Sequence, residues 1–467
     1  MKDTLAHEAS VSKTALMINL GCPKNEVDAE EMLGVLAERG YTICADEDGA
    51  DVVVVNTCGF IQSAKEEAIE AVLRAVERKR AGRYGRVIVT GCLSQRYGFD
   101  LAKELPEVDA FLGAGQMGCI ADVADHVLNG EGLIFQVQPQ AHHRWLTHVN
   151  RVRAGAPWSA YLKISEGCDH TCTFCAIPVM RGRHQSKPLA RVIEEARRLC
   201  EEGAREINLI AQDSTQYGLD IYQRVMLPEL LRRLSEIEEV RWLRLFYCYP
   251  SRLTDEVIEA IAGLPKVCAY IDMPLQHSDD ELLRRMRRAG NAESYRKLIE
   301  KLRTAIPDVA LRTTFIVGFP GESIAQFQRL IDFINEIRFD HVGVFEYSAE
   351  EGTFAANLAN TVSAHEKRQR RNELMKLQQG ISLKKNQEWM GRTLTVLIEG
   401  CGGPPYLRSA KGNSWRRGRT FRDAPEVDGL TFVRNCDAEP GEMVLVKITG
   451  ATAYDLIGEP DRRQVKD

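Results

Sequence analysis

Short, uninterrupted apolar runs that alternate with amphipathic segments constrain the fold of this chain most strongly. The segments 14–21, 51–57 and 86–91 contain the uninterrupted apolar runs ALMI, VVVV and VIV, which are typical of strands covered on both faces. Between these runs, residues 25–40 and 63–80 carry apolar side chains at helical spacing. A strand–helix alternation of this kind predicts a parallel sheet with helices on both faces.

The same alternation resumes after residue 158. Six further strands are predicted, beginning at Ala160, Glu206, Trp242, Ala269, Leu311 and His341. A complete eight-unit barrel needs about 250 residues, and this section is shorter. We therefore expect a partial (β/α)6 barrel of parallel strands.

A long charged helical stretch at 363–390 separates this barrel from a C-terminal part that contains strands only, with turns at Asp428–Gly429 and Pro440–Gly441. These features predict a small antiparallel β-barrel. We therefore expect an α/β protein with four parts: an N-terminal parallel α/β domain at 12–132, a linker at 133–155, the partial barrel at 156–390 and the β-barrel at 391–460.

The composition is ordinary for a globular protein, with 44% hydrophobic and 27% charged residues. A net charge of −5 gives no overall positive field, so any contact with nucleic acid must be local. No apolar run reaches the roughly 18 residues that span a bilayer, and the first residues lack the apolar core of a secretory signal. We expect a cytoplasmic protein with no membrane partner.

Thirteen cysteines in a chain expected in a reducing compartment indicate metal binding or catalysis rather than disulfides. Cys22, Cys58 and Cys92 each follow directly on a predicted strand. Because the carboxyl ends of parallel strands meet at one edge of a sheet, we expect these three thiols to converge. The alternative is that small side chains merely fit tight strand ends. Five others lie in or beside apolar runs and are expected to be buried packing residues: Cys44, Cys119, Cys200, Cys248 and Cys268.

A second trio, Cys168, Cys172 and Cys175, has the spacing CxxxCxxC. Structural zinc sites take four ligands, and His170 lies inside this loop, where it would strain a fourth bond. Three cysteines can instead hold a 4Fe–4S cluster with one open iron. The loop follows the first predicted barrel strand, at the face where such barrels carry their active sites, so the pattern favours a cluster over zinc.

The motif's surroundings, residues 161–188, closely resemble the methylthiotransferase branch of the radical S-adenosylmethionine (SAM) superfamily. The contexts NLGCPKNEVDAE, VNTCGFIQSAKEEAI and VTGCLSQRY resemble the N-terminal domain of that branch. The C-terminal strands resemble a TRAM barrel. The resemblance therefore covers nearly the whole chain.

The resemblance implies two 4Fe–4S clusters and SAM as cofactors. Cys168, Cys172 and Cys175 would hold the cluster that cleaves SAM to methionine and a 5′-deoxyadenosyl radical, and Phe174 would shield it. Cys22, Cys58 and Cys92 would hold a second cluster, whose open iron carries the sulfur to be inserted. Four residues in motif-like contexts at predicted strand ends would line the SAM pocket: Gln212, Gln276, Arg312 and Gly318. Gln276 and Arg312 could equally be structural polar groups.

Residues 211–218, 273–280, 311–323 and 421–429 are similar to the members of the branch that modify a ribosomal protein. The implied reaction inserts sulfur and methyl at the β-carbon of an aspartate in small-subunit ribosomal protein twelve, using two SAM molecules and an electron donor such as a flavodoxin or ferredoxin. The alternative is the same chemistry on tRNA adenosine. An iron–sulfur scaffold without catalysis is disfavoured, because a structural cluster is normally closed by four ligands.

The stretch 401–421 is longer than expected between two barrel strands and combines basic with aromatic residues. Such a combination favours RNA contact through the C-terminal barrel, although a docking site for a ribosomal-protein tail or a solvated loop would give the same composition. The residues concerned are Tyr406, Arg408, Lys411, Trp415, Arg416, Arg417 and Arg419.

Overall fold

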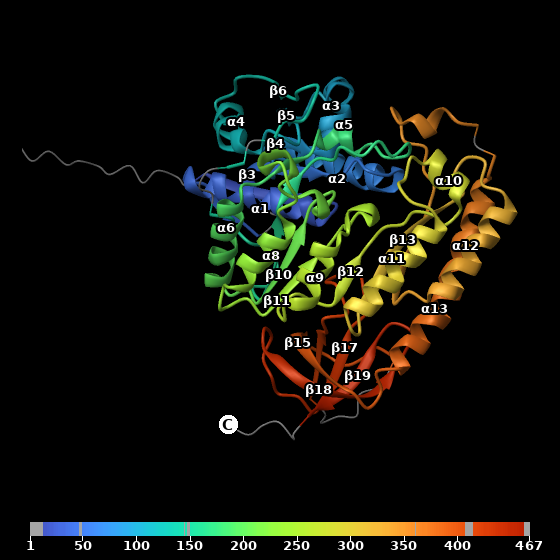
Figure 1. Ribbon diagram of the computed structural model, residues 1–467. Coiled ribbons are helices and arrows are strands. Elements are labelled where there is room, and N and C mark those ends of the chain that lie inside the picture. Colours follow the sequence, from blue (N-terminus) through green and yellow to red (C-terminus); the bar gives the residue numbers. More distant parts are fainter. Residues whose placement is uncertain are drawn as a thin grey trace, which may run out of the picture. The chain divides into compact units, whose positions relative to one another are not determined.

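The computed structural model describes residues 13–45, 49–143, 145–146, 150–359, 361–406 and 414–461 (Figure 1). The chain divides into two compact units. The first unit consists of Met1–Ala154 together with Ala176–Arg183, and the second consists of Gly155–Cys175 together with His184–Asp467. The chain thus passes from one unit to the other three times.

A six-stranded, fully parallel sheet forms the first unit, with the strand order β2-β1-β3-β4-β5-β6. Its core has two halves, one on each face of the sheet: Val52 and Val54 point toward α1 and α4, and Val53 and Val55 toward α2. All four valines are fully buried, which explains the uninterrupted apolar run. The strands are β1 (Thr14–Asn19), β2 (Thr42–Cys44), β3 (Ala50–Thr57), β4 (Tyr84–Gly91), β5 (Ala110–Leu112) and β6 (Ile134–Gln136), and the helices are α1 (Pro23–Glu38), α2 (Gln62–Arg80), α3 (Cys92–Glu104), α4 (Ile120–Leu128) and α5 (Ile177–Arg181).

Residues 133–155, which the sequence pattern assigns to a linker, contribute structure to the first unit. Strand β6 lies within them and pairs in parallel with β5. Arg151 is buried, and its Nε donates a hydrogen bond to Oε2 of Glu30 on α1 at 3.0 Å. The first unit therefore extends further along the chain than the loss of alternation suggests.

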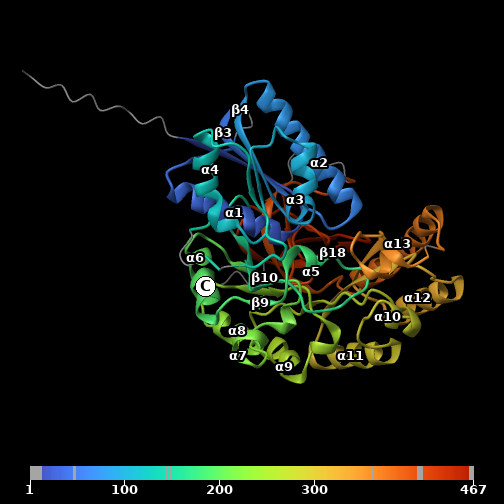
Figure 2. The same cartoon turned by 90° about the horizontal axis from the view of Figure 1, so that it is seen from above.

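Six parallel strands and their helices form most of the second unit. They make two three-stranded sheets, β7-β10-β11 and β12-β13-β14, joined by a parallel bridge between Leu243 and Val267. Seen from above, the helices follow an arc outside the strands (Figure 2), as expected of a partial barrel. The strands are β7 (Ser159–Lys163), β10 (Glu206–Ile210), β11 (Trp242–Leu245), β12 (Tyr270–Asp272), β13 (Ala310–Val317) and β14 (His341–Glu346).

Most helices of the second unit pack on one large apolar core, whereas α7 has no buried residue. The longest, α13, begins with a capping box between Ser363 and Glu366 and runs toward the C-terminal barrel. These helices are α6 (Leu189–Glu201), α7 (Leu219–Tyr222), α8 (Leu227–Ser235), α9 (Asp255–Gly263), α10 (Asp280–Arg285), α11 (Ala292–Ala305), α12 (Ile324–Ile337) and α13 (Ala364–Gln387).

A closed five-stranded barrel with the order β15-β16-β17-β19-β18 completes the second unit. Its neighbouring strands are antiparallel except for β17 and β19, which are parallel. Strand β16 lies within the stretch 401–421, where the sequence suggests an insertion. The strands are β15 (Thr393–Cys401), β16 (Trp415–Arg419), β17 (Thr431–Arg434), β18 (Met443–Ala451) and β19 (Leu456–Pro460).

Across the described ranges, no helix has both the length and the apolar composition that crossing a membrane requires.

Candidate functional site

The loop that carries Cys168, Cys172 and Cys175 follows β7 at the carboxyl end of the parallel strands. A short antiparallel pair, β8 (Ser165–Glu166) and β9 (Gln185–Ser186), closes its base. The backbone N–H of Cys175 donates to the carbonyl oxygen of Cys172 at 3.2 Å, which forms a tight turn. The main chain of Thr173 is held by the carbonyl of Met286 at 3.0 Å. The loop is therefore built by backbone contacts, and all three thiols are partly exposed.

His170 is held by neighbours other than the three cysteines. Its Nε2 lies 2.7 Å from Oδ2 of Asp213, and its ring stacks on Tyr249 with centroids 3.7 Å apart and planes inclined by 10°. On the other side of the loop, Nη1 of Arg288 lies 3.8 Å from Sγ of Cys172. His170 is thus a structural residue of the loop, and Arg288 brings a positive charge to a cysteine of the motif.

The chemistry of this trio fits an iron–sulfur cluster. Burial raises the pKa of Cys168 to about 12, so a bound metal must displace its proton. Among the residues that the structure describes, no three cysteine, histidine, aspartate or glutamate side chains lie close enough to share a single metal ion. A cube of four irons and four sulfides separates its ligands more widely than one ion does, and an all-thiolate donor set suits it.

Phe174 lies within the cysteine loop of the second unit, and Gln212 lies near the strand that precedes the loop. Phe174 packs on an apolar cluster that includes Met286. Gln212 follows β10, and its Nε2 donates to Oε1 of Glu166, a buried carboxylate that also lies 3.1 Å from Nζ of Lys163. The Oε1 of Gln212 is buried without a hydrogen-bond partner in the described part of the chain, so this amide retains one acceptor for a ligand.

Gln276 and Gly318 follow the carboxyl ends of β12 and β13. Gln276 has a φ of 74°, which is unusual for a residue with a side chain, and its backbone pairs with Phe315. Gly318 has a φ of 72°, and a Cβ there would lie 2.3 Å from Cγ of Lys367. Its N–H donates to the buried Glu322, which leaves Gly318 a structural role at this edge.

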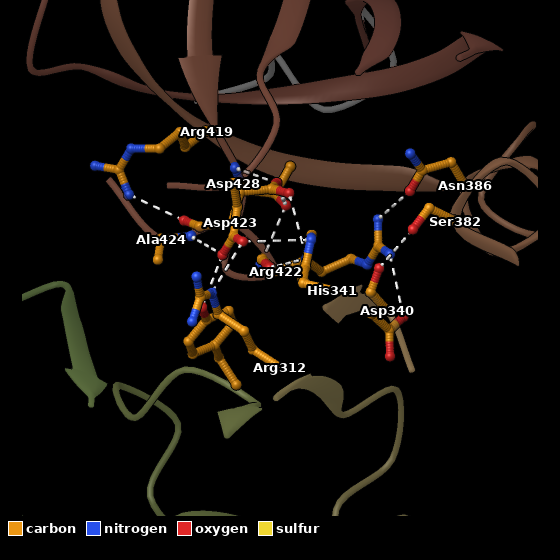
Figure 3. Close-up of polar contacts among 12 residues, drawn as sticks. Arg312, Asp340, His341, Ser382, Asn386, Arg419, Arg422, Asp423, Ala424 and Asp428 are labelled. Carbon is orange, nitrogen blue, oxygen red and sulfur yellow. Dashed lines mark hydrogen bonds and ion pairs between the residues drawn. The ribbon is translucent and has the colours of Figure 1, made fainter. Parts of the chain in front are cut away.

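Arg312 does not lie with these residues. It is the third residue of β13 and precedes Gly318 by six positions, about 20 Å along a strand. Its guanidinium lies 3.2 Å from Asp272. It also lies 3.3 Å from Asp428 of the C-terminal barrel (Figure 3). The expectation that Arg312 lines the SAM pocket is therefore not supported, because its position in the strand places it toward the amino-terminal face.

The C-terminal barrel packs on that amino-terminal face through the loop between β16 and β17 (Figure 3). Arg419, predicted as part of an RNA-contact segment, is buried and paired with Glu206, the first residue of β10. Arg416 donates from Nε to the carbonyl oxygen of Ala438 at 2.6 Å, whereas Arg417 is exposed. Arg408 and Lys411 lie outside the described residues. Arg419 therefore belongs to the junction between the two barrels.

Cys22, Cys58 and Cys92 converge in the first unit, at the carboxyl edge of its sheet. They follow β1, β3 and β4 respectively. A Cβ added at Gly21 would lie 2.9 Å from Cβ and 3.3 Å from Sγ of Cys58. Sulfur–oxygen distances of 4.0 and 3.8 Å connect Cys22 and Cys92 to the same atom, Oδ1 of Asn25. The three cysteines therefore lie close together, as their placement at strand ends predicts.

Asn25 joins the loops that carry this trio. Its Nδ2 donates to the carbonyl oxygens of Leu20 at 2.8 Å and Thr57 at 3.1 Å, which fixes the loops after β1 and β3. Burial raises the pKa of Cys92 to about 12, and the adjacent Arg181 opposes that shift. Burial also raises the pKa of Cys58. Like the first trio, this site offers three thiols to a metal group that can replace their protons.

Three family models match the chain: the Radical SAM superfamily at residues 162–334, Uncharacterized protein family UPF0004 at 14–113, and the TRAM domain at 390–460. Together with the partial barrel and its cysteine loop, these matches define a radical SAM enzyme. A relative from Symbiobacterium thermophilum, ribosomal protein uS12 methylthiotransferase RimO, is 46% identical over 445 residues, which cover 95% of this chain and 90% of the relative. A relative of the same name from Anaeromyxobacter is 47% identical over 443 residues, 95% and 92% of the two chains. The chain belongs to the RimO family of methylthiotransferases.

Among solved structures, the radical SAM methyltransferase TsrM from Kitasatospora setae, with cobalamin and a [4Fe-4S] cluster bound, superposes with a TM-score of 0.52 at 15% identity. The match covers 72% of each chain. At this identity the likeness concerns the fold alone.

Sequence reasoning missed several polar residues that hold the cysteines in place. Asn25 and Asp28 lie in the stretch after Cys22, and Arg181 and Glu166 lie in the stretch around CxxxCxxC. Asn25 and Glu166 could have been found from the sequence, because Asn25 follows Cys22 by three residues and Glu166 precedes Cys168 by two. Arg181 could not have been found in this way, because its thiol partner, Cys92, lies 89 residues away.

Proposed function

We propose that this protein methylthiolates ribosomal protein uS12, forming 3-methylthioaspartate at the β-carbon of one aspartate with two molecules of SAM. One observation carries the proposal: a chain with two separate cysteine trios aligns over 95% of its length with relatives named for this activity. The alternative reaction, on tRNA adenosine, has no comparable support among these relatives.

The residues of the chain divide the work between the two units. Cys168, Cys172 and Cys175 would hold the cluster that binds SAM, and Cys22, Cys58 and Cys92 would hold the second cluster. When bound, these groups supply one-electron cleavage of SAM and the sulfur atom. The second-unit loop keeps its shape through His170 and Asp213, so cluster binding does not have to order it.

The substrate explains the choice of cofactor. A C–H bond at the β-carbon of an aspartate is too weakly acidic for a protein base, so its activation needs radical chemistry that side chains alone do not provide. The free acceptor oxygen of Gln212 lies at the edge where SAM binds in this class of barrel. We assign Gln212, Phe174 and Gln276 to the walls of that pocket, and Gly318 to their support.

Further partners follow from the same proposal. A protein such as a flavodoxin or ferredoxin would supply electrons, and the C-terminal barrel would contact RNA through exposed residues such as Arg417 and Tyr406. Because ribosomal proteins are made and assembled in the cytoplasm, we place the enzyme there.

The decisive experiment offers uS12 and tRNA separately to the reconstituted enzyme, with reductant and SAM, and uses mass spectrometry to find one added methylthio group. We expect the gain on uS12. A gain on tRNA only would overturn the substrate, and absence of 5′-deoxyadenosine would overturn the reaction class. Cys172→Ala should abolish both products, whereas Cys200→Ala, which removes a buried thiol of α6 outside both trios, should leave them unchanged.

A further inference from the structure

Helix α5 carries residues of the CxxxCxxC region into the other unit. It begins two residues after Cys175, yet residues 176–183 belong to the first unit. Ala176 and Met180, both nearly fully buried, form an apolar cluster with Cys92. The helix therefore packs directly beside one thiol of the Cys22–Cys58–Cys92 trio.

Arg181, the last residue of α5, directs three nitrogen atoms at three partners. Its Nε donates to Sγ of Cys92 at 3.1 Å, its Nη1 to Oδ2 of Asp28 at 2.6 Å, and its Nη2 to Oδ1 of Asn25. The side chain is only 3% exposed. Because a different nitrogen of the planar guanidinium contacts each partner, the orientation of Arg181 is fixed.

An ion pair between Arg181 and Asp28 would satisfy a buried charge without involving a thiol. The structure contains that ion pair and, in addition, places Nε at hydrogen-bond distance from Cys92, while Asn25 shares its Oδ1 among Arg181, Cys92 and Cys22. Arg181, Asn25 and two of the three cysteines thus form one connected polar group. Such outer partners orient metal ligands and commonly change affinity for the metal by 10–100-fold.

We propose that Arg181 is a positioning residue for the second iron–sulfur cluster, which it serves in two ways. It holds Cys92 in the orientation of a ligand, and its positive charge favours the reduced cluster and so raises the reduction potential. This inference rests on the proposed second cluster. Hydrogen bonds to the cysteine sulfurs and net charge are the main protein controls on the potential of such clusters.

The second unit contains a parallel arrangement. Arg288 directs Nη1 at Sγ of Cys172 at 3.8 Å, its guanidinium lies over the ring of Tyr249, and its Nη2 donates to the carbonyl oxygen of Pro274 at 2.5 Å. Each trio thus has an arginine, fixed by other contacts, that reaches one of its sulfurs. The recurrence supports a role in cluster chemistry for this type of contact.

The test uses the full-length chain with Cys168, Cys172 and Cys175 changed to alanine, so that one cluster remains after reconstitution. In this background, Arg181→Met should release iron to a chelator roughly tenfold faster than the unsubstituted background. The midpoint potential of its remaining cluster should be more negative, as measured by electron paramagnetic resonance during a redox titration. Arg181→Lys keeps the charge but not the fork of donors, so it should recover the potential more fully than the rate of iron release.

Arg151→Met is the matched control. It removes another buried arginine of the first unit, one paired with Glu30, and should lower the thermal midpoint without changing potential or iron release. If Arg181→Met and Arg181→Lys both match the background in potential and release, the positioning role is wrong. If Arg181→Met does not fold, unchanged iron release in Arg181→Lys overturns it equally. A background that binds no iron would instead contradict the second cluster itself.

Discussion

At the scale of single residues, the two cysteine trios differ from the chain's packing cysteines in their surroundings. Cys200, Cys248 and Cys268 lie within the apolar core of the second unit or are buried beside it, and none of them belongs to a group of three cysteines. Cys22 and Cys172, by contrast, are partly exposed and face polar neighbours, so they remain accessible to a metal group.

A single change in the first unit should separate the two sites. Cys58→Ala removes one of the three ligands that we propose for the second cluster, so we expect about half of the iron to be lost while SAM cleavage persists. Iron per chain and 5′-deoxyadenosine are the measurements. Cys119→Ala, a partly buried cysteine of the same unit, should alter neither. Loss of all iron together with SAM cleavage would contradict two independent sites.

At the scale of elements, glycines allow the cysteine loops of the first unit to approach one another. Gly21, Gly59 and Gly91 each adjoin a cysteine of the trio. A Cβ at Gly59 would lie 2.9 Å from the backbone of Leu93, and one at Gly91 would lie 2.5 Å from the carbonyl oxygen of Thr57. These contacts are tighter than any side chain allows, so the loop sequence determines how closely the thiols converge.

Gly21→Ala tests this at the loop after β1. The new methyl group would press on Cys58, and we expect the second cluster to lose iron while the CxxxCxxC cluster stays intact. Gly40→Ala is the control, because Gly40 has a similar φ of 94° but nothing within 4 Å of the added carbon. It should cost about 1–2 kcal/mol of backbone strain and no iron. Equal iron loss in both variants would show that strain alone is responsible.

The elements also show what the sequence could predict and what it could not. Apolar runs located β3 and β13, and the strand-end rule brought Cys22, Cys58 and Cys92 together. Strand β16 was missed because its sequence, WRRGR, has no apolar alternation. It pairs with β15 and β17, and its last residue, Arg419, contacts Glu206, 213 residues away in the chain. The SAM-pocket expectation for Arg312 overlooked a signal in the sequence: the predicted strand begins at Leu311, so Arg312 lies at its amino end, as it does in β13.

At the scale of the whole molecule, buried charges join the two barrels of the second unit. Glu206 on β10 accepts from Arg244 at 3.0 Å and from Arg419 of the C-terminal barrel at 2.6 Å, and all three side chains are almost fully buried. Tyr270 donates to Asp428 across the same junction at 2.7 Å. Removing one member of such a group leaves the others as uncompensated buried charges, which commonly costs about 3–5 kcal/mol.

Glu206→Gln should therefore destabilise the protein by about 3–5 kcal/mol at neutral pH, measured by urea unfolding. Burial would raise the pKa of Glu206, but Arg419 and Arg244 outweigh it and lower the pKa from 4.5 to about 2. Since the folded pKa is the lower one, the carboxylate's contribution is complete above pH 4.5 and is lost as the pH falls toward 2. The difference in the free energy of unfolding between the wild type and the variant should therefore decrease across that pH range.

Glu336→Gln serves as the control, because it breaks an exposed ion pair with Arg296 and should change stability by less than about 1 kcal/mol. If the stability difference between the wild type and Glu206→Gln stays constant from pH 7 to pH 2, the Glu206 carboxylate is not charged in the folded protein.

The passage of residues 176–183 from the second unit into the first has a consequence for how this protein can be divided. Three backbone crossings connect the units, so cutting the chain once, at the crossing near residue 155, yields no self-sufficient half. A fragment ending there would lack Arg181 beside Cys92, and a fragment starting there would carry α5 without the partners of Met180 and Arg181. The two units must therefore be expressed as one continuous chain.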